Sequence, residues 1–376
     1  MQNMHNPQIN NSSHFSNAPP TRRGILFPAK IWYNIRMLVS DFSYDLPDEC
    51  IASEPPKVRG TTRLLALNRQ TGEITDSKYA KLADFLEPGD LIILNDTRVM
   101  RSRVFTELPD GRPRELVVLE RHDSELNHVM YRGKLHDGDQ LTVVNHETGA
   151  KTDTQITIKK ILGNGIALAE CKTPLDQVAE QYGNVPLPPY MHRDATKADI
   201  ERYQTVWAKE NGSAAAPTAS LNMTEQLIKE LKAKGVQVEY LTLHVGLGTF
   251  LPIRSDNVEE HHMHSEWFHI PKATIEAIEA TKKAGRRVIA VGTTVTRTLE
   301  FWGKTGKTEG EDDIFIYPGF KFKVIDALVT NFHAPKSTVL MLTAAFAGWE
   351  HLKPAYDHAT SSGYKLLSYG DSMFIY

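Results

Sequence analysis

Arg287 to Trp302 read R-V-I-A-V-G-T-T-V-T-R-T-L-E-F-W, and this stretch decides the fold. The residues up to Val291 form a continuous apolar run that is typical of a buried strand. Gly292 breaks that run, and from Thr294 onward apolar residues recur with the period of a helix. A strand joined to a helix by so short a turn is the repeating unit of an α/β domain.

The same alternation continues on both sides of this segment. Apolar runs predict further strands, and helix-period patterns predict helices between them: strands 64–67, 91–94, 238–243 and 327–330, and helices 272–284 and 338–347. This order predicts a mainly parallel sheet covered by helices. Ligands of such sheets gather at the carboxyl ends of the strands, so three loops become candidates: those that begin at His244, Gly292 and Asn331.

Short alternating segments replace this pattern between residues 99 and 172. Six of them are separated by turn residues, at 101–106, 115–120, 128–134, 140–144, 155–161 and 166–169. This spacing predicts a small antiparallel β-barrel. We therefore expect an α/β main domain made of residues 37–98 and 173–376, with the barrel inserted as residues 99–172.

Residues 1–36 are Asn-rich and have few periodic apolar positions, which indicates a poorly ordered or non-native extension. Translation starting at Met37 is an alternative, because the periodic sequence begins directly after it. Only Cys50 and Cys171 are present among 376 residues, which fits a reducing cytoplasmic setting. No apolar run approaches the roughly 20 residues that cross a bilayer. The net charge of −3 means that nucleic acid would need a local basic patch.

Small residues fill the loop around Ala214 to Ser220, within Tyr203 to Met223. Such residues offer little apolar area to a core, so Ala215, Ala216, Pro217 and Thr218 indicate a backbone that a ligand approaches closely. A flexible Ala/Ser/Pro linker is the alternative. The helix pattern of residues 221–236 follows, which favours a loop that opens onto a helix N-terminus.

Polar groups follow each predicted strand. Gly246 and Gly248 would admit a ligand after His244, and the Thr293 and Thr294 hydroxyls with Arg297 would bind an anion unless they only cap the helix. Asn331 and His333 stand after the next strand. Asp371 lies in a turn, 368–372, that forms either a lid or simply the chain end.

Histidines cluster with carboxylates in E-E-H-H-M-H-S-E, Glu259 to Glu266. A metal site would need a third ligand at a recognisable spacing, and none is present. An acid/base role for His264 with Glu266 fits better, because imidazole titrates near neutral pH. The chain also lacks a phosphate loop, a G-x-S-x-G nucleophile elbow and a G-x-G-x-x-G turn. These absences argue against nucleotide hydrolysis, esterase chemistry and dinucleotide redox.

Together the motifs closely resemble the S-adenosylmethionine:tRNA ribosyltransferase-isomerase family of queuosine biosynthesis. They occur in the same order from about Leu38 to Ile375: D-F-S-Y-D-L-P from Asp41, N-D-T-R-V from Asn95, P-L-P-P-Y from Pro186, Y-Q-T-V from Tyr203, A-A-P-T-A from Ala215, L-H-V-G-L-G-T-F from Leu243, M-H-S-E from Met263, V-G-T-T from Val291, Y-P-G-F from Tyr317, V-T-N-F-H-A-P-K-S-T from Val329 and S-Y-G-D-S-M-F-I from Ser368.

The resemblance implies an α/β domain with an inserted barrel. It also implies transfer of the ribosyl group of S-adenosylmethionine to 7-aminomethyl-7-deazaguanine at the tRNA wobble position, giving epoxyqueuosine. It implies no metal and no cofactor beyond S-adenosylmethionine as co-substrate, and we expect a cytoplasmic monomer. We expect His264 or His244 as the base and Glu266 as its orienting partner. Candidates for tRNA binding, by position and charge, are Arg98, Arg101, Arg103 and Lys336.

This sequence departs from the family pattern at three places. Ser220 and Asn222 stand where the family has glycine and histidine, Arg101 replaces a proline, and His262 is an additional histidine. An amide does not take up a proton near pH 7, so Asn222 cannot serve as a base. A diverged paralogue that binds tRNA or a nucleoside without completing the transfer is therefore the main alternative. A metal-dependent hydrolase built on the histidine cluster is the other.

Overall fold

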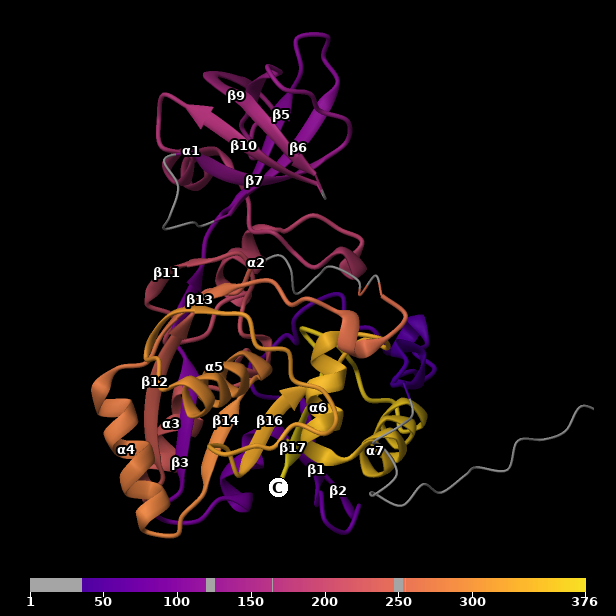
Figure 1. The fold of residues 1–376 in the computed structure, drawn as a ribbon, viewed down its shortest axis with the longest axis vertical. Helices are drawn as coiled ribbons and strands as arrows, with labels where there is room; N and C mark the ends of the chain where they lie inside the picture. The colour runs from indigo at the N-terminus through magenta and orange to yellow at the C-terminus, as the bar shows by residue number, and fades with distance from the viewer. Residues whose placement is uncertain (1–35, 120–125, 164, 247–252, 254) are drawn as a thin grey trace, which may run out of the picture. The chain divides into compact units, whose positions relative to one another are not determined.

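The computed structural model describes residues 36–119, 126–163, 165–246, 253 and 255–376 (Figure 1). Met37 to Tyr376 form one compact unit. The extension expected at residues 1–36 lies outside the described residues, apart from Arg36, and so does Gly248.

Nine strands form one sheet in the order β15-β13-β12-β3-β14-β16-β17-β1-β2. Its centre is parallel, because β12 and β14 flank β3 and β16 continues beside β14. The strand bounds are β1 Arg63–Leu67, β2 Ile74–Lys78, β3 Leu91–Asn95, β12 Gln237–Leu243, β13 Glu266–His269, β14 Val288–Val291, β15 Glu309–Asp312, β16 Ala327–Asn331 and β17 Ser372–Ile375. A further parallel pair consists of β4 (Thr97–Val99) and β11 (Glu210–Ser213). The predicted α/β class with a mainly parallel sheet is confirmed.

Both faces of the sheet are covered, and β3 shows why. Successive side chains of a strand point to opposite faces. Leu91 and Ile93 therefore pack in the core on one face, whereas Ile92 and Leu94 pack in the core on the other. The helices α4 to α7 line the first face, and α3 with the 3-10 helix Tyr79–Phe85 covers the second (Figure 1). The helix bounds are α1 Leu175–Tyr182, α2 Lys197–Arg202, α3 Glu225–Ala233, α4 Lys272–Lys283, α5 Thr293–Thr305, α6 Thr338–Ala347 and α7 Trp349–Ser361.

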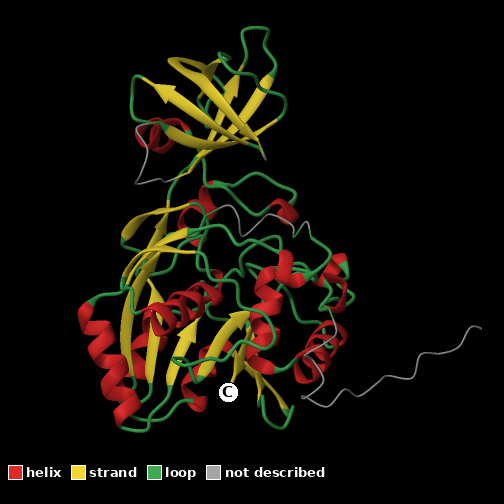
Figure 2. Ribbon diagram, in the orientation of Figure 1, coloured by secondary structure: helices red, strands yellow, loops and turns green. Residues whose placement is uncertain are grey.

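The predicted barrel is also confirmed. Six antiparallel strands close in the order β10-β7-β6-β5-β8-β9 (Figure 2). Their bounds are β5 Arg103–Glu107, β6 Pro113–Leu119, β7 Asn127–Arg132, β8 Gln140–Val144, β9 Lys151–Gly163 and β10 Ile166–Cys171. Leu175 and Val178 of α1 are buried in the barrel's own apolar core. The first helix after the barrel strands therefore packs with the barrel.

Two interpretations of the sequence differ from the structure. The segment from Ser368 is neither a lid nor a loose chain end, because it leads into β17, a buried strand between β16 and β1. The small-residue loop does not open directly onto a helix, because a 3-10 turn at Thr218–Ser220 intervenes and α3 begins only after the N-cap Thr224. In the described part of the chain, no helix is long and apolar enough to span a bilayer.

Gly183 lies where the chain returns from the barrel. A Cβ there would stand 2.5 Å from the Ala179 carbonyl oxygen, 2.6 Å from that of Arg101 and 2.8 Å from that of Arg103. All three are backbone atoms that cannot turn away. We expect Gly183→Ala to lower the free energy of unfolding by about 3 kcal/mol, the upper end for overpacking, measured by urea denaturation.

Gly303→Ala is the matched control, because its Cβ would meet side-chain atoms alone outside its own helix: the Val324 Cγ2 methyl at 2.6 Å and the Lys323 Cβ at 3.8 Å. Alanine favours the interior of α5, which offsets part of the cost of displacing that buried methyl, so the net loss should stay clearly below that of Gly183→Ala, at about 1 kcal/mol. Equal losses in the two variants would contradict the steric account.

Candidate functional site

A cavity of about 590 Å³ opens at the carboxyl ends of β14 and β16, and we call it the strand-end cavity. Its wall brings together segments that are far apart in the sequence. They are Pro189 and Tyr190, Tyr203, Ala215 to Ala219, Val245, Gly292 to Thr294, Thr330 to Ser337, and Leu367 with Ser368. This is the edge at which ligands of parallel sheets bind.

The small-residue loop forms one wall of this cavity. Ala215, Ala216, Pro217 and Thr218 all line it, as does Ala219 in the 3-10 turn. The loop is held from behind, because Ala214 donates its N–H to the Val245 carbonyl at 2.9 Å and the Ser213 hydroxyl donates to the Ala215 carbonyl at 2.7 Å. A loop fixed in this way is not a flexible linker. Its short side chains leave the volume of the cavity open.

The N-terminus of α5 forms a second wall. Gly292 precedes the helix with φ of 102°, a left-handed conformation that favours glycine. The N–H groups of the first turn of a helix have no intrahelical partner. In α5 no side chain caps them either. Thr293 and Thr294 line the cavity, and the Thr294 hydroxyl makes no hydrogen bond to the protein. This arrangement offers several donors to an anion.

The segment after β16 completes the cavity. Asn331 is only 2% exposed, and His333 and Lys336 line the wall beside it. Burial lowers the pKa of His333 to about 3, so its imidazole is neutral at physiological pH, and its Nε2 lies 2.8 Å from the Thr330 hydroxyl. Of the described lining residues, Lys336 alone carries a charge at pH 7. Its backbone adopts φ of 59°, a strained conformation for a non-glycine residue.

The three expected catalytic residues gather at the ends of β12 and β13, next to the cavity and outside its described lining. His264 Nε2 lies 3.5 Å from Glu266 Oε1, and the same oxygen accepts the Gly246 N–H at 2.8 Å. His244 stacks on Trp267 and has its Nδ1 2.8 Å from the Thr97 hydroxyl. Val245, between His244 and Gly246, lines the cavity itself.

Arg297 is engaged by carboxylates. Its Nη1 lies 2.6 Å from Glu266 Oε2, its Nη2 donates to the Asp312 carbonyl at 3.3 Å, and its side chain is 6% exposed. Burial by itself would raise the pKa of Glu266, but Arg297, with His264 and Gly246, holds that pKa below its ordinary value. The geometry therefore assigns Arg297 to balancing a buried carboxylate and gives no support to its expected role as counter-charge for a substrate.

Asp371 is likewise engaged with the protein, because its two oxygens accept the backbone N–H groups of Arg63 at 2.6 Å and Lys365 at 2.7 Å. Burial raises its pKa. It fixes the turn before β17 and does not line the cavity.

The candidates for tRNA binding are scattered. Arg103 is paired with Glu115 at 2.8 Å and Asp194 at 2.7 Å, and Arg101 lies 3.9 Å from Glu180. Arg98 is exposed on β4, and only Lys336 reaches the cavity. Arg98 and Lys336 therefore remain the better candidates for phosphate.

Asn222 occupies the position at which the family has histidine. Its side chain is 2% exposed and donates from Nδ2 to the Gly370 carbonyl at 3.0 Å. It is not among the described residues that line the cavity. At this position the amide serves as a structural donor, so its lack of basicity does not remove a proton acceptor from the cavity wall.

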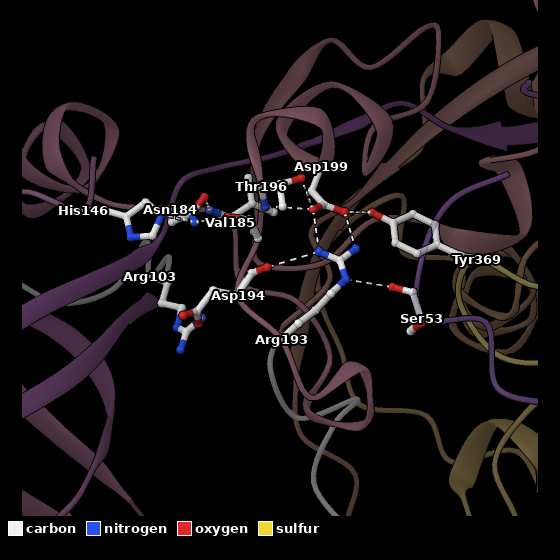
Figure 3. A network of polar contacts seen from close by, with 11 residues as sticks. Ser53, Arg103, His146, Asn184, Val185, Arg193, Asp194, Thr196, Asp199 and Tyr369 are labelled. Carbon is white, nitrogen blue, oxygen red and sulfur yellow. Dashed lines mark hydrogen bonds and ion pairs between the residues drawn. The ribbon is translucent and has the colours of Figure 1, made fainter. Parts of the chain in front are cut away.

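Sequence reasoning missed a polar network that braces the cavity (Figure 3). Arg193 binds Asp199 through both Nη atoms, at 2.7 and 2.8 Å, and Tyr369 donates to the same carboxylate at 2.7 Å. Burial alone would raise the pKa of Asp199, but these bonds hold it well below its usual range. The Tyr190 hydroxyl bonds to Ser368 nearby. The motifs P-L-P-P-Y and S-Y-G-D-S were the available signal, but neither shows which hydroxyls meet.

Comparison with known proteins assigns the family. The family model described as "Queuosine biosynthesis protein" matches residues 39–375. A protein of Pelodictyon phaeoclathratiforme named S-adenosylmethionine:tRNA ribosyltransferase-isomerase is 53% identical over 348 residues, covering 90% of this chain and all of that protein. The chain belongs to the S-adenosylmethionine:tRNA ribosyltransferase-isomerase family.

Other members of the family agree. The protein of the same name from Francisella tularensis subsp. novicida is 44% identical over 349 residues, again with 90% of this chain and all of that protein covered. The crystal structure of S-adenosylmethionine tRNA ribosyltransferase from Thermotoga maritima has a TM-score of 0.51 and 32% identity, and covers 90% of this chain and all of that one. The sequence resemblance is thereby confirmed.

Arg297→Ala would remove the arginine that balances the buried Glu266 carboxylate at 2.6 Å. We expect the free energy of unfolding to fall by about 3–5 kcal/mol, measured by urea denaturation. Arg286→Ala is the control, because its 3.1 Å pair with Glu87 is exposed, at 47% and 68%, and should contribute at most about 1 kcal/mol. A loss as small for Arg297 as for Arg286 would refute the structural role of the buried pair.

Proposed function

We propose that the strand-end cavity is the site where this chain performs the reaction of its family. The ribosyl group of S-adenosylmethionine moves to 7-aminomethyl-7-deazaguanine at the tRNA wobble position, giving epoxyqueuosine-tRNA and releasing adenine and methionine. One observation carries this proposal: six family motifs, from P-L-P-P-Y to V-T-N-F-H-A-P-K-S-T, meet in one cavity of about 590 Å³. That volume is typical of sites for small molecules of this size.

The small-residue wall suits a flat base. Ala215 and Ala216 bring the backbone close to a ligand, and Thr218 adds a hydroxyl beside them. A site that must hold two large substrates gains rate from positioning, because a fixed approach removes much of the entropy cost of the reaction. The fixed loop between Ser213 and Ser220 serves that purpose.

His264 is the proposed proton acceptor. The sulfonium of S-adenosylmethionine acidifies the neighbouring ribose C5′ hydrogens, and a base placed within reach of one of them removes it. The carboxylate of Glu266, whose Oε1 lies 3.5 Å from His264 Nε2, orients the ring. His333 lines the cavity, but burial disfavours its protonated form, which suits it to a neutral hydrogen-bonding role. His244 is the remaining candidate base.

The anticodon region of tRNA is the proposed macromolecular partner. Lys336 at the cavity and the exposed Arg98 would contact phosphates, with Arg101 and Arg103 as further candidates. The enzyme is proposed to act as a cytoplasmic monomer, without a metal and without a cofactor beyond its co-substrate.

A diverged paralogue is the second candidate, favoured only by the replacement at Asn222. The position of Asn222, bonded to Gly370 and away from the cavity lining, weakens that case. The metal-dependent hydrolase has less support, since the described residues contain no group of three or more His, Cys, Asp or Glu side chains arranged to hold an ion.

Adenine release tests both the activity and the base. With tRNA carrying the aminomethyl-deazaguanine precursor, the protein should release adenine from S-adenosylmethionine, and the digested tRNA should contain epoxyqueuosine by mass. His264→Gln should lower kcat by about 10²–10⁴-fold, the usual contribution of a positioned base.

Two further variants, a control and the alternative base, are needed to interpret the loss of kcat in His264→Gln. His136→Gln changes an exposed barrel histidine, whose side chain is 65% exposed, and should leave kcat unchanged. A large loss of kcat in His333→Gln but not in His264→Gln would identify His333, on the cavity wall, as the base in place of His264. Bound tRNA or S-adenosylmethionine without any adenine release would favour the paralogue.

A further inference from the structure

One corner of the strand-end cavity contains an acceptor that the protein leaves unpaired. Asn331 is 2% exposed and lines the cavity, and its Oδ1 makes no hydrogen bond. Its Nδ2 reaches only the Asp371 carbonyl, at 3.5 Å. An acceptor screened from solvent and left unpaired costs about 1–3 kcal/mol, so a ligand that brings a donor here would recover that free energy.

Donors lie in the same cavity, at the start of α5, the helix that follows the neighbouring strand β14. The first-turn N–H groups of α5 have no side-chain cap, and the Thr294 hydroxyl has no hydrogen-bond partner. The positive end of the helix dipole adds to their attraction for an anion. Arg297, the nearest cation on this helix, is paired with Glu266. The N–H groups of a helix terminus and one hydroxyl suit a single negative charge. We therefore expect an anion such as one carboxylate.

The strand register places these two features side by side. Gly292, at the start of α5, donates its N–H to Val329 of β16 at 2.8 Å, and Asn331 follows two residues later. Neighbouring strands lie about 4.8 Å apart. Donors for an anion and an acceptor for a cation thus stand within the reach of one small group.

We propose that this corner binds the α-amino acid end of S-adenosylmethionine, with its carboxylate on the α5 N-terminus and Thr294 and its ammonium on Asn331 Oδ1. The inference rests on the proposed function and adds the orientation of the co-substrate. A carboxylate and an ammonium on one carbon match the adjacent donors and acceptor. A tRNA phosphate fits less well, because it brings only acceptors and would leave Asn331 Oδ1 unpaired.

Calorimetric titration of the full chain with three ligands tests this orientation. The ligands are S-adenosylmethionine, its decarboxylated analogue and 5′-methylthioadenosine, which lacks the whole amino acid end. Thr294→Val, which preserves shape, should weaken S-adenosylmethionine about 10-fold, as expected for one hydrogen bond to a charged group, and leave the decarboxylated analogue unchanged. Asn331→Leu should weaken S-adenosylmethionine similarly and leave 5′-methylthioadenosine unchanged.

Thr298→Val is the matched control in the same helix, because its hydroxyl donates to the Thr294 carbonyl at 3.1 Å and it is not among the described lining residues. It should bind all three ligands as the unchanged protein does. The proposal fails if Thr294→Val leaves the affinity for S-adenosylmethionine unchanged, or weakens the decarboxylated analogue equally. Adenine release by the unchanged protein is measured separately, so the orientation can fail while the proposed function stands.

Discussion

The parallel pairing of β3, β14 and β16 is the constraint on which the rest of the structure depends. Parallel strands bring their carboxyl ends to one edge, so the turns after β14 and β16 must meet there. Gly292 keeps the first turn tight through a left-handed φ, and Asn331, the last residue of β16, leads into the second. The strand-end cavity follows from that pairing, and the small residues from Ala215 to Thr218 keep it open.

The buried pair of Glu266 and Arg297 ties the edge of the sheet to this centre. It joins β13 to α5, the helix whose N-terminus faces the cavity, and reaches Asp312 on β15. Removing Arg297 would leave two buried carboxylates, Glu266 and Asp312, without their arginine in a poorly solvated place. The same carboxylate binds Gly246 and contacts His264, so the position of the proposed base depends on a contact that also supports the fold.

Periodicity predicted the repeated elements well. The barrel strands and the βα alternation follow from patterns that depend on burial alone. Ala215 and Thr294 stand out in the sequence on other grounds, the small residues of one loop and the position of the other residue after a strand, and both line the cavity. Periodicity could not predict contacts between side chains that only the folded chain brings together. The sequence shows an arginine after a glycine turn, but not that Arg297 faces Glu266, nor that both oxygens of Asp371 bind backbone N–H groups. The short β17 was missed because four apolar residues at a chain end do not distinguish a strand from a tail.

A crystal structure of the full chain with S-adenosylmethionine tests the central claim most directly. The account predicts electron density for the co-substrate in the strand-end cavity, against Ala215 to Thr218 and the N-terminus of α5. Density for S-adenosylmethionine elsewhere, such as in the groove beside Arg103, Tyr131 and His192, with this cavity filled only by water, would contradict it.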